Sequence, residues 1–570
     1  MAVSIPGQYE YREILAKDYI RILTLYPASE LNAPLCGELD QAPLEPESSY
    51  ATISYSWGMN ADGDATLNRI IYISGRPLAI TQNLFEGLKR IRHLEVPRRL
   101  WVDAICINQG ATLERNAQVS QMAKIFSCSN HLIIWHGEGE SEDDDNLILR
   151  VASYDLEQCT LNNEDGGICC YTTSHNPHYI RFNGEIVNFH EIMHVLQVIN
   201  SSYIHMGKFA KAIDDALEST DVHPLVVRSV RKTIQIALKF FLRRYWRRRW
   251  IAQQLYHSRT CTIEVRWGAC QSENLWQMME GPLWQVLKAA DCLVLDRDIA
   301  SMRDIVKELA SPIDDAVLTG LAISAIQALM SSTAHITFDD FIGVLVALAC
   351  TKCSDDRDQL FALSSLSPGY AIEPDYSMTT TQVYLNFAYQ FIKRGRLTTL
   401  LTSFGDEPSE GDEVLDLPSW VPDLRSTYLD LTDITKIEDD DPILLDGDII
   451  VFKAYYLGTI EATSSGIGET ANTPHSIIYC DQQRRSVSCP MPETCNRKGS
   501  PKHGDYIFVL FYRHVNSTLE DVDKLALVLR KQLRTYNGQN VYRQVAFFFD
   551  PLDELGHQYV FGPETTICMA

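Results

Sequence analysis

Residues 100–109 read LWVDAICINQ, an apolar run that carries an aspartate and then continues into Cys, Asn and Gln. A fully buried strand would hold aliphatic residues throughout, whereas a turn would be rich in Gly, Asn and Ser. This stretch combines both patterns, which is typical of a strand that ends by presenting polar side chains. We predict a strand over 100–107, followed by a loop whose polar side chains have a specific role.

The segments around this stretch alternate between strand and helix patterns. Strand-like runs and amphipathic helical stripes follow one another at 50–58 (strand), 70–75 (strand), 80–94 (helix), 112–126 (helix) and 131–137 (strand). Such alternation predicts βαβ units around a parallel sheet flanked by helices. The predicted fold class of an N-terminal domain over 1–146 is therefore α/β, of the flavodoxin-like kind.

Three further regions are expected after this domain. Residues 147–300 are mixed and mostly helical, and they include the basic block RRYWRRRW (243–250) within a predicted helix. Residues 301–425 form a predicted helical region. After the acidic run EDDD, residues 440–570 contain β patterns such as DIIVFKAYYLGTI, which predict a small C-terminal β domain.

Composition and charge limit the classes of function. The 570 residues are 45% apolar and 22% charged, which is ordinary for a globular protein, and the net charge is −24. This negative field repels nucleic acid and anionic membranes, so neither is an expected partner. The N-terminal residues lack a signal-peptide pattern, and the longest apolar run, FIGVLVALAC (341–350), is about half of a membrane span. We expect a cytosolic protein whose 15 cysteines are reduced thiols.

Polar residues gather where two predicted strands end, and ligands of doubly wound sheets bind outside the carboxyl ends of the strands. The candidate site residues are Ser54, Ser56 and Trp57 at one strand end, Asp103, Asn108 and Gln109 at the other, and Glu114 and Arg115 in the following helix. Glu114 would lie in the first turn of its helix. The helix dipole alone favours a carboxylate there; the alternative is a carboxylate directed into a pocket.

Four blocks carry a resemblance to a known family. They are YATISYSWG (50–58), ITQNLFEGLKRIR (80–92), RLWVDAICINQ (99–109) and IIWHG (133–137). In this order and spacing they resemble the heterokaryon incompatibility (HET) domain of filamentous fungi. The resemblance continues more loosely through RYWRRRWIAQQL (244–255) to LPSWVPDL (417–424). Departures from the family pattern include Ala111, where the helix cap would then come from Thr112 or Asn108, and Gln254, which replaces a frequent glutamate.

This resemblance implies a protein of non-self recognition and regulated cell death after cell fusion. HET domains are regarded as distant relatives of TIR domains, some of which cleave NAD at the nicotinamide–ribose bond with one helix-borne glutamate. Transferred to this sequence, that glutamate is Glu114, and NAD would be a substrate rather than a cofactor. A carboxylate there would stabilise an oxocarbenium-like ribose. The polar strand-end residues would bind ribose or phosphate, and Trp57 would stack on a base.

Several alternatives stay open at this point. The DAICINQ residues could bind a ligand without turnover, or satisfy loop backbone groups without any ligand. The domain could then be a non-enzymatic signalling module that acts by self-association with other proteins. A more distant alternative is a zinc hydrolase, because HEIMH (190–194) matches H-E-x-x-H through His190 and His194. The simpler interpretation of that motif is two histidines on a helix surface.

Overall fold

The structure is a computed structural model that describes residues 7–152, 179–188, 232–273, 313–430 and 444–570, each range with shorter gaps inside it. The chain divides into two compact units. Unit 1 comprises Met1–Ile336, Cys350–Ser354 and Phe361–Tyr376, and unit 2 comprises Thr337–Ala349, Asp355–Leu360 and Ser377–Ala570. The finer division into four regions remains a prediction.

Unit 1 is built on a mixed sheet of nine strands in the order β11-β10-β7-β3-β6-β1-β2-β4-β5. The strands are β1 Tyr19–Leu25, β2 Cys36–Pro43, β3 Ala51–Tyr55, β4 Leu67–Ile73, β5 Arg76–Thr81, β6 Arg98–Trp101, β7 His131–Trp135, β10 Thr262–Trp267 and β11 Cys270–Ser272. Strands β10, β7, β3 and β6 are parallel, as predicted, but β1 pairs antiparallel with both β6 and β2. The prediction of a parallel sheet was therefore wrong for half of its strand pairs, because the antiparallel pairs involve β1, β2, β5 and β11, which were not predicted.

The parallel half has a doubly wound topology. The chain passes from β3 to β6 on one side of it and then returns to β7 on the other side. In such sheets the crevice for a ligand lies at the carboxyl ends of the strands between which the winding reverses. Here that point lies between the ends of β3 and β7.

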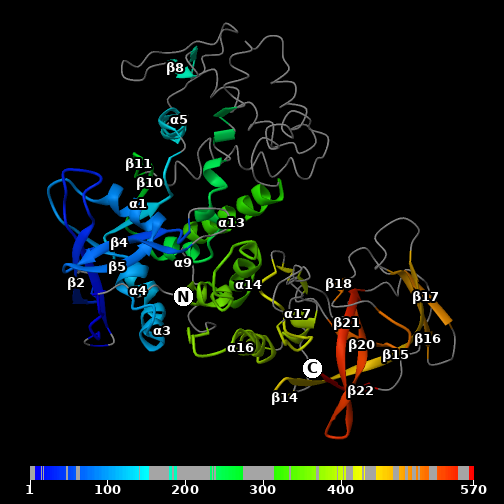
Figure 1. Ribbon diagram of the computed structural model, residues 1–570. Helices are drawn as coiled ribbons and strands as arrows, with labels where there is room; N and C mark the ends of the chain where they lie inside the picture. Colours follow the sequence, from blue (N-terminus) through cyan, green and yellow to red (C-terminus); the bar gives the residue numbers. More distant parts are fainter. Residues whose placement is uncertain are drawn as a thin grey trace. The chain divides into compact units, whose positions relative to one another are not determined.

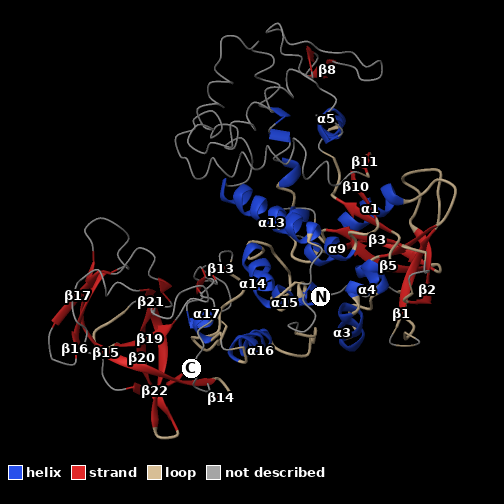
Figure 2. Ribbon diagram, turned by 180° about the vertical axis from the view of Figure 1, so that it is seen from behind, coloured by secondary structure: helices blue, strands red, loops and turns tan. Residues whose placement is uncertain are grey.

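Helices cover both faces of this sheet (Figure 1, Figure 2). The helical elements of unit 1 are α1 Gln82–Ile91, α2 Asp103–Cys106, α3 Thr112–Ser120, α4 Met122–Ser127, α5 Glu142–Ala152, the 3-10 turn η3 Arg244–Arg247, α9 Ile251–His257, α13 Ile313–Ser331 and the 3-10 turn η4 Ser364–Leu366. On one face α1 approaches so closely that a Cβ on Gly87 would lie 2.8 Å from the Trp135 ring. On the other face Ser54 of β3 bonds to Gln254 of α9. The predicted stripe Leu84, Leu88 and Ile91 is buried, as expected.

Three predicted elements differ from those found. The strand predicted over 100–107 stops at Trp101, and Asp103–Cys106 forms one helical turn. The helix predicted over 112–126 is interrupted at Gln121, between α3 and α4. The block RRYWRRRW is a 3-10 turn followed by a break before α9, rather than part of one helix. At the first and third places long-range bonds of polar side chains override the local periodicity, since Asp103 bonds Trp57 and Arg248, and Arg248 also bonds the Tyr55 carbonyl.

Helices of unit 2 begin at well-formed caps. The remaining helices are α14 Phe338–Ala347, α15 Asp358–Phe361, α16 Thr380–Ile392 and α17 Leu397–Leu401. Thr337 and Asp340 form a capping box at α14, and Thr379 and Gln382 form one at α16, so each start is fixed by its own sequence.

Within the residues that the structure describes, no helix combines the length and the apolar character needed to cross a membrane.

The last part of unit 2 is a small β domain, which confirms the predicted C-terminal β region. Its strands are β14 Leu444–Asp446, β15 Ile449–Ser465, β16 Pro474–Asp481, β17 Ser486–Pro490, β18 Asn496–Arg497, β19 Tyr506–Tyr512, β20 Asp523–Tyr536, β21 Gln539–Phe549 and β22 Glu564–Met569. Strands β15, β19, β20, β21 and β22 pair in that order, and β22 pairs back with β15, which closes a barrel.

Two short strand pairs lie outside both large sheets. They are formed by β8 Tyr179–Phe182 with β9 Glu185–Asn188, and by β12 Phe404–Gly405 with β13 Leu429–Asp430.

Candidate functional site

The predicted strand-end residues divide into two polar clusters. The first, called here the strand-end cluster, consists of Ser56, Trp57, Asp103 and Arg248. Asp103 Oδ2 accepts a hydrogen bond from Trp57 Nε1 at 3.0 Å and another from Arg248 Nη2 at 3.2 Å. Its other oxygen accepts from the backbone N–H of Ala104 at 2.7 Å. The sequence had grouped Trp57 with Asp103, and the structure brings them together.

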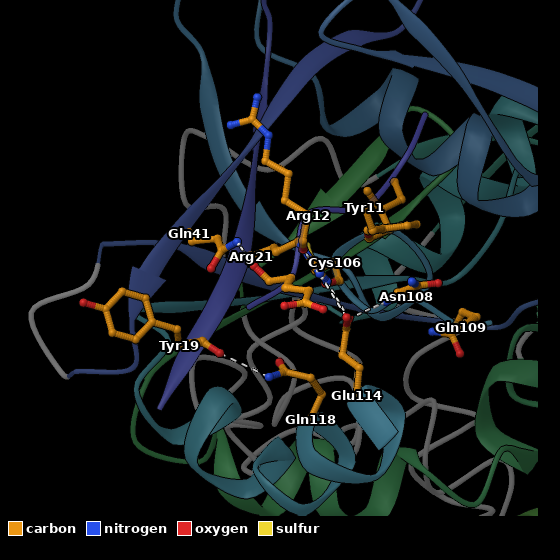
Figure 3. A network of polar contacts seen from close by, with 12 residues as sticks. Tyr11, Arg12, Tyr19, Arg21, Gln41, Cys106, Asn108, Gln109, Glu114 and Gln118 are labelled. Carbon is orange, nitrogen blue, oxygen red and sulfur yellow. Dashed lines mark hydrogen bonds and ion pairs between the residues drawn. The ribbon is translucent and has the colours of Figure 1, made fainter. Parts of the chain in front are cut away.

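The second cluster, called here the Arg21–Glu114 network, joins β1 to the start of α3 (Figure 3). Arg21 Nη1 lies 2.5 Å from Glu114 Oε1, and Arg21 Nη2 lies 3.0 Å from Oε2. The backbone N–H of Asn108 donates to the same Oε1 at 2.7 Å. The Arg21 side chain is 2% exposed and the Glu114 side chain 15%. This is a two-pronged, largely desolvated ion pair, the strongest form of the arginine–carboxylate contact.

Arg21 also fixes the backbone that surrounds it. Its Nη1 donates to the carbonyl of Cys106 at 3.1 Å, and its Nη2 donates to the carbonyl of Arg12 at 2.5 Å. The guanidinium stacks on the ring of Tyr11, whose hydroxyl donates to the carbonyl of Ile105. The network therefore holds carbonyls of the α2 turn and the amide of Asn108 at once, which locks the DAICINQ segment in one shape.

Burial shifts two pKa values within this network. Burial raises the pKa of the Cys106 thiol to about 12, so the thiol stays protonated and unreactive at neutral pH. Burial also raises the pKa of Tyr11 above its usual range, so its hydroxyl remains a donor. Neither group is thus a nucleophile, and both act by holding the loop.

The other predicted site residues lie apart from one another. Ser54 is buried beneath α9, where its Oγ donates to Gln254 Oε1 at 2.6 Å. Gln109 Nε2 donates to the Asp103 carbonyl at 2.9 Å and so links the two clusters. The Arg115 guanidinium lies 3.7 Å above the ring of Tyr376. Ser54 thus belongs to the sheet–helix interface rather than to the strand end.

The helix after DAICINQ begins without a capping side chain at its cap position. Ala111 occupies that position, and its side chain makes no hydrogen bond to the first turn of α3. Asn108 Oδ1 accepts from Gly110 instead. The carboxylate of Glu114 turns back to the Asn108 amide, so it closes the loop from inside the helix.

The zinc motif HEIMH, with His190 and His194, lies outside the residues that the structure describes. Among the described residues, no group of His, Cys, Asp and Glu has the arrangement of a metal site. Arg21 was missed from the sequence, and Arg248 was noticed only as part of the basic block RRYWRRRW (243–250), not as a residue of the candidate site. Arg21 could have been noticed, because it is the one charge inside the apolar run YIRILTL of 19–25.

Comparison with known proteins identifies the region that holds both clusters. Residues 50–254 match the family model "Heterokaryon incompatibility protein (HET)". The chain contains a HET domain. The resemblance seen in the four sequence blocks is thereby confirmed. The matched range includes Asp103, Glu114 and Arg248, but not Arg21.

A curated relative from Neurospora crassa, "Heterokaryon incompatibility protein 6, OR allele", is 24% identical over 460 residues. The similarity covers 74% of this chain and 60% of that relative, so the chain spans about 60% of the length of the relative. No solved structure matches this HET-domain chain.

Proposed function

We propose that this chain acts in heterokaryon incompatibility, as an effector of non-self recognition after cell fusion. Its HET domain over 50–254 supports this proposal, and so does the similarity to a relative named for incompatibility. Because that similarity extends beyond the HET domain to 74% of the chain, the helical region and part of unit 2 belong to the same functional unit in this proposal.

For the mode of action we propose association with other protein molecules rather than turnover. The observation that carries this choice is the state of Glu114, whose two oxygens take three hydrogen bonds from Arg21 and Asn108. A carboxylate that must stabilise a cationic transition state needs a lone pair and a negative charge directed at the substrate. Here the Arg21 cation already neutralises that charge, so Glu114 serves to hold the loop.

Hydrolysis of NAD through Glu114 is the second candidate function. Its support is the position of Glu114 in the first turn of α3, with 15% of its side chain exposed beside the exposed Gln109. The glycosidic C–N bond would break, nicotinamide would leave with the bonding pair, and water would add to the ribose carbon with loss of a proton. Arg21 would have to release the carboxylate first.

Nicotinamide release from NAD by the purified full chain separates the two candidates. The variants are Glu114→Gln, Arg21→Gln and the control Glu86→Gln, which removes a carboxylate on α1 that pairs with Lys89 and accepts a hydrogen bond from Gln82. Oligomeric state is measured in parallel by sedimentation over a range of concentrations. Arg21→Gln breaks the ion pair and leaves the Glu114 carboxylate in place, so it controls for lost stability.

Association without turnover predicts no nicotinamide from any variant and a concentration-dependent assembly of the wild-type protein. Turnover that disappears in Glu114→Gln but survives in Arg21→Gln would refute that mode of action and establish the hydrolase. A protein that neither turns over NAD nor assembles at any concentration would contradict both modes.

A further inference from the structure

The carboxyl ends of β3 and β7, where the winding of the sheet reverses, carry two arginines from one short segment. Arg248 Nη1 donates to the carbonyl of Tyr55, the last residue of β3. Arg243 Nη1 donates to the carbonyl of His136, the residue after β7, at 3.2 Å. Tyr55 and Trp135 are paired in register, and neighbouring strands lie about 4.8 Å apart. The two guanidinium groups are therefore anchored at adjacent strand ends.

Two buried polar side chains adjoin the same strand ends. Ser56 is 5% exposed, and its Oγ has no hydrogen-bond partner among the described residues. His136 is 4% exposed, and neither of its ring nitrogens has a partner in that part of the chain. Ser54 and Ile134 pair in register, so Ser56 and His136, two residues further on, lie on the same face of the sheet. Buried polar atoms without partners are rare in folded proteins and call for a ligand or water.

The charges around these groups favour an anion. Asp103 is the carboxylate of the strand-end cluster, and it is already bonded to Trp57, Arg248 and the Ala104 amide. The carboxylate of Glu138 pairs with Arg90 at 2.9 Å. A third carboxylate, Asp145, lies one strand further along, against Gly139 and Gly268. Among the residues that the structure describes, the two arginines where β3 and β7 end are accompanied by one bonded carboxylate, Asp103, and this set carries a net positive charge.

We propose that the HET domain binds a phosphate group of a small molecule at the carboxyl ends of β3 and β7, between Arg248 and Arg243, with the Ser56 hydroxyl as a further donor. The planar guanidinium fork matches the oxygens of phosphate, which distinguishes arginine from lysine at such a site. The half-buried indole of Trp57 borders the same strand end and offers an apolar surface to the rest of the ligand. Glu114 takes no part in this site, since it is bonded to Arg21 and Asn108.

Isothermal titration of the full chain with inorganic pyrophosphate tests the site, with ionic strength held constant by sodium chloride. The informative variants are Ser56→Ala and Arg248→Lys. Ser127→Ala and Arg259→Lys are the matched controls: the exposed Ser127 donates to the Lys124 carbonyl, and the exposed Arg259 donates to the Tyr256 carbonyl. Because the Ser56 hydroxyl has no partner in the described chain, Ser56→Ala should keep its melting temperature without ligand.

The expected result is saturable binding by the wild-type protein and by both controls. Arg248→Lys should weaken binding about tenfold, and Ser56→Ala about threefold to tenfold, as for loss of a hydrogen bond to a charged group. No saturable binding by the wild-type protein would overturn the proposal, and so would equal affinities for all five proteins. Either candidate function is compatible with the presence or the absence of this phosphate site. A negative result for nicotinamide release therefore does not refute the phosphate site, and a negative result for pyrophosphate binding does not refute either function.

Discussion

The two polar clusters of the HET domain differ in how completely their groups are bonded. In the Arg21–Glu114 network, both oxygens of the carboxylate and both terminal nitrogens of the guanidinium have partners, and Arg21 Nε is the one atom of the ion pair without a partner among the described residues. Around the strand-end cluster, the Ser56 hydroxyl and the His136 ring have none among the described residues. Both clusters include residues of the same ten-residue stretch, 100–109.

This difference separates a structural role from a binding role. A buried network whose charged ends are bonded to each other rigidifies the fold, whereas a buried side chain with no bonded polar atom remains available for a ligand. Polar residues that are neighbours in the sequence can thus serve two purposes. The glutamate singled out by resemblance to the family falls on the structural side of this division.

The largest expected effect tests the structural side. Glu114→Ala should lower the free energy of unfolding by about 3 kcal/mol or more, because it leaves the buried charge of Arg21 uncompensated. Denaturant unfolding followed by tryptophan fluorescence measures this loss. The double variant Arg21→Met/Glu114→Leu should recover most of it, since the buried pair is then replaced by apolar groups. A loss below about 1 kcal/mol for Glu114→Ala would erase the contrast between the two clusters.

A smaller effect is expected in the strand-end cluster. Asp103→Asn keeps an oxygen for Trp57 but removes the charge that faces Arg248, so the loss should be about 1–2 kcal/mol. Asp18→Asn is the control, because Asp18 is 74% exposed and pairs with Lys124 only at 3.9 Å. The same unfolding measurement applies to both. If Asp103→Asn costs as much as Glu114→Ala, the strand-end cluster is as structural as the other.

The smallest effect concerns pH. Burial, and secondarily the nearby Arg243, lower the pKa of His136 well below its usual value. The unfolded chain therefore takes up a proton near pH 6.5 that the folded chain refuses, so this contribution to stability is present above pH 6.5 and is lost as pH falls. When the pH is lowered from 7 to 5.5, the free energy of unfolding of His136→Phe should fall by about 1 kcal/mol less than that of the wild-type protein. Parallel stability curves for the two proteins would show that His136 is protonated in the folded state.

The sequence was a good guide where apolar periodicity determines structure. It predicted the helix around Leu84 and Leu88, the buried strand at 131–135, and the β character of 449–460, because in each the spacing of apolar residues matches one regular element. It failed for 103–106, where the apolar residues continue but Asp103 turns the chain by bonding Trp57 and Arg248. Those partners are 46 and 145 residues away.

Within the candidate site, the sequence predicted which residues are involved better than it predicted which of them contact one another. Trp57 and Asp103 were correctly placed together, because both follow strands that proved to be parallel neighbours. Glu114 was predicted, but its partner was not, since Arg21 lies on β1, a strand that was not predicted from the sequence. Ser54 was misplaced, because it lies within β3 beneath α9, where its Oγ donates to Gln254, and not at the strand end.

The position of Arg21 outside the matched range has a practical consequence for how this domain can be inherited. A segment cut at residue 50 would lose β1 and β2, expose the edge of β6, and leave Glu114 without its cation. Recombination between related genes would therefore need to transfer β1 and β2 together with residues 50–254. Strand β1 is a structural part of this domain. An exchange that separates β1 from residues 50–254 would yield a protein that folds poorly rather than one with a new specificity.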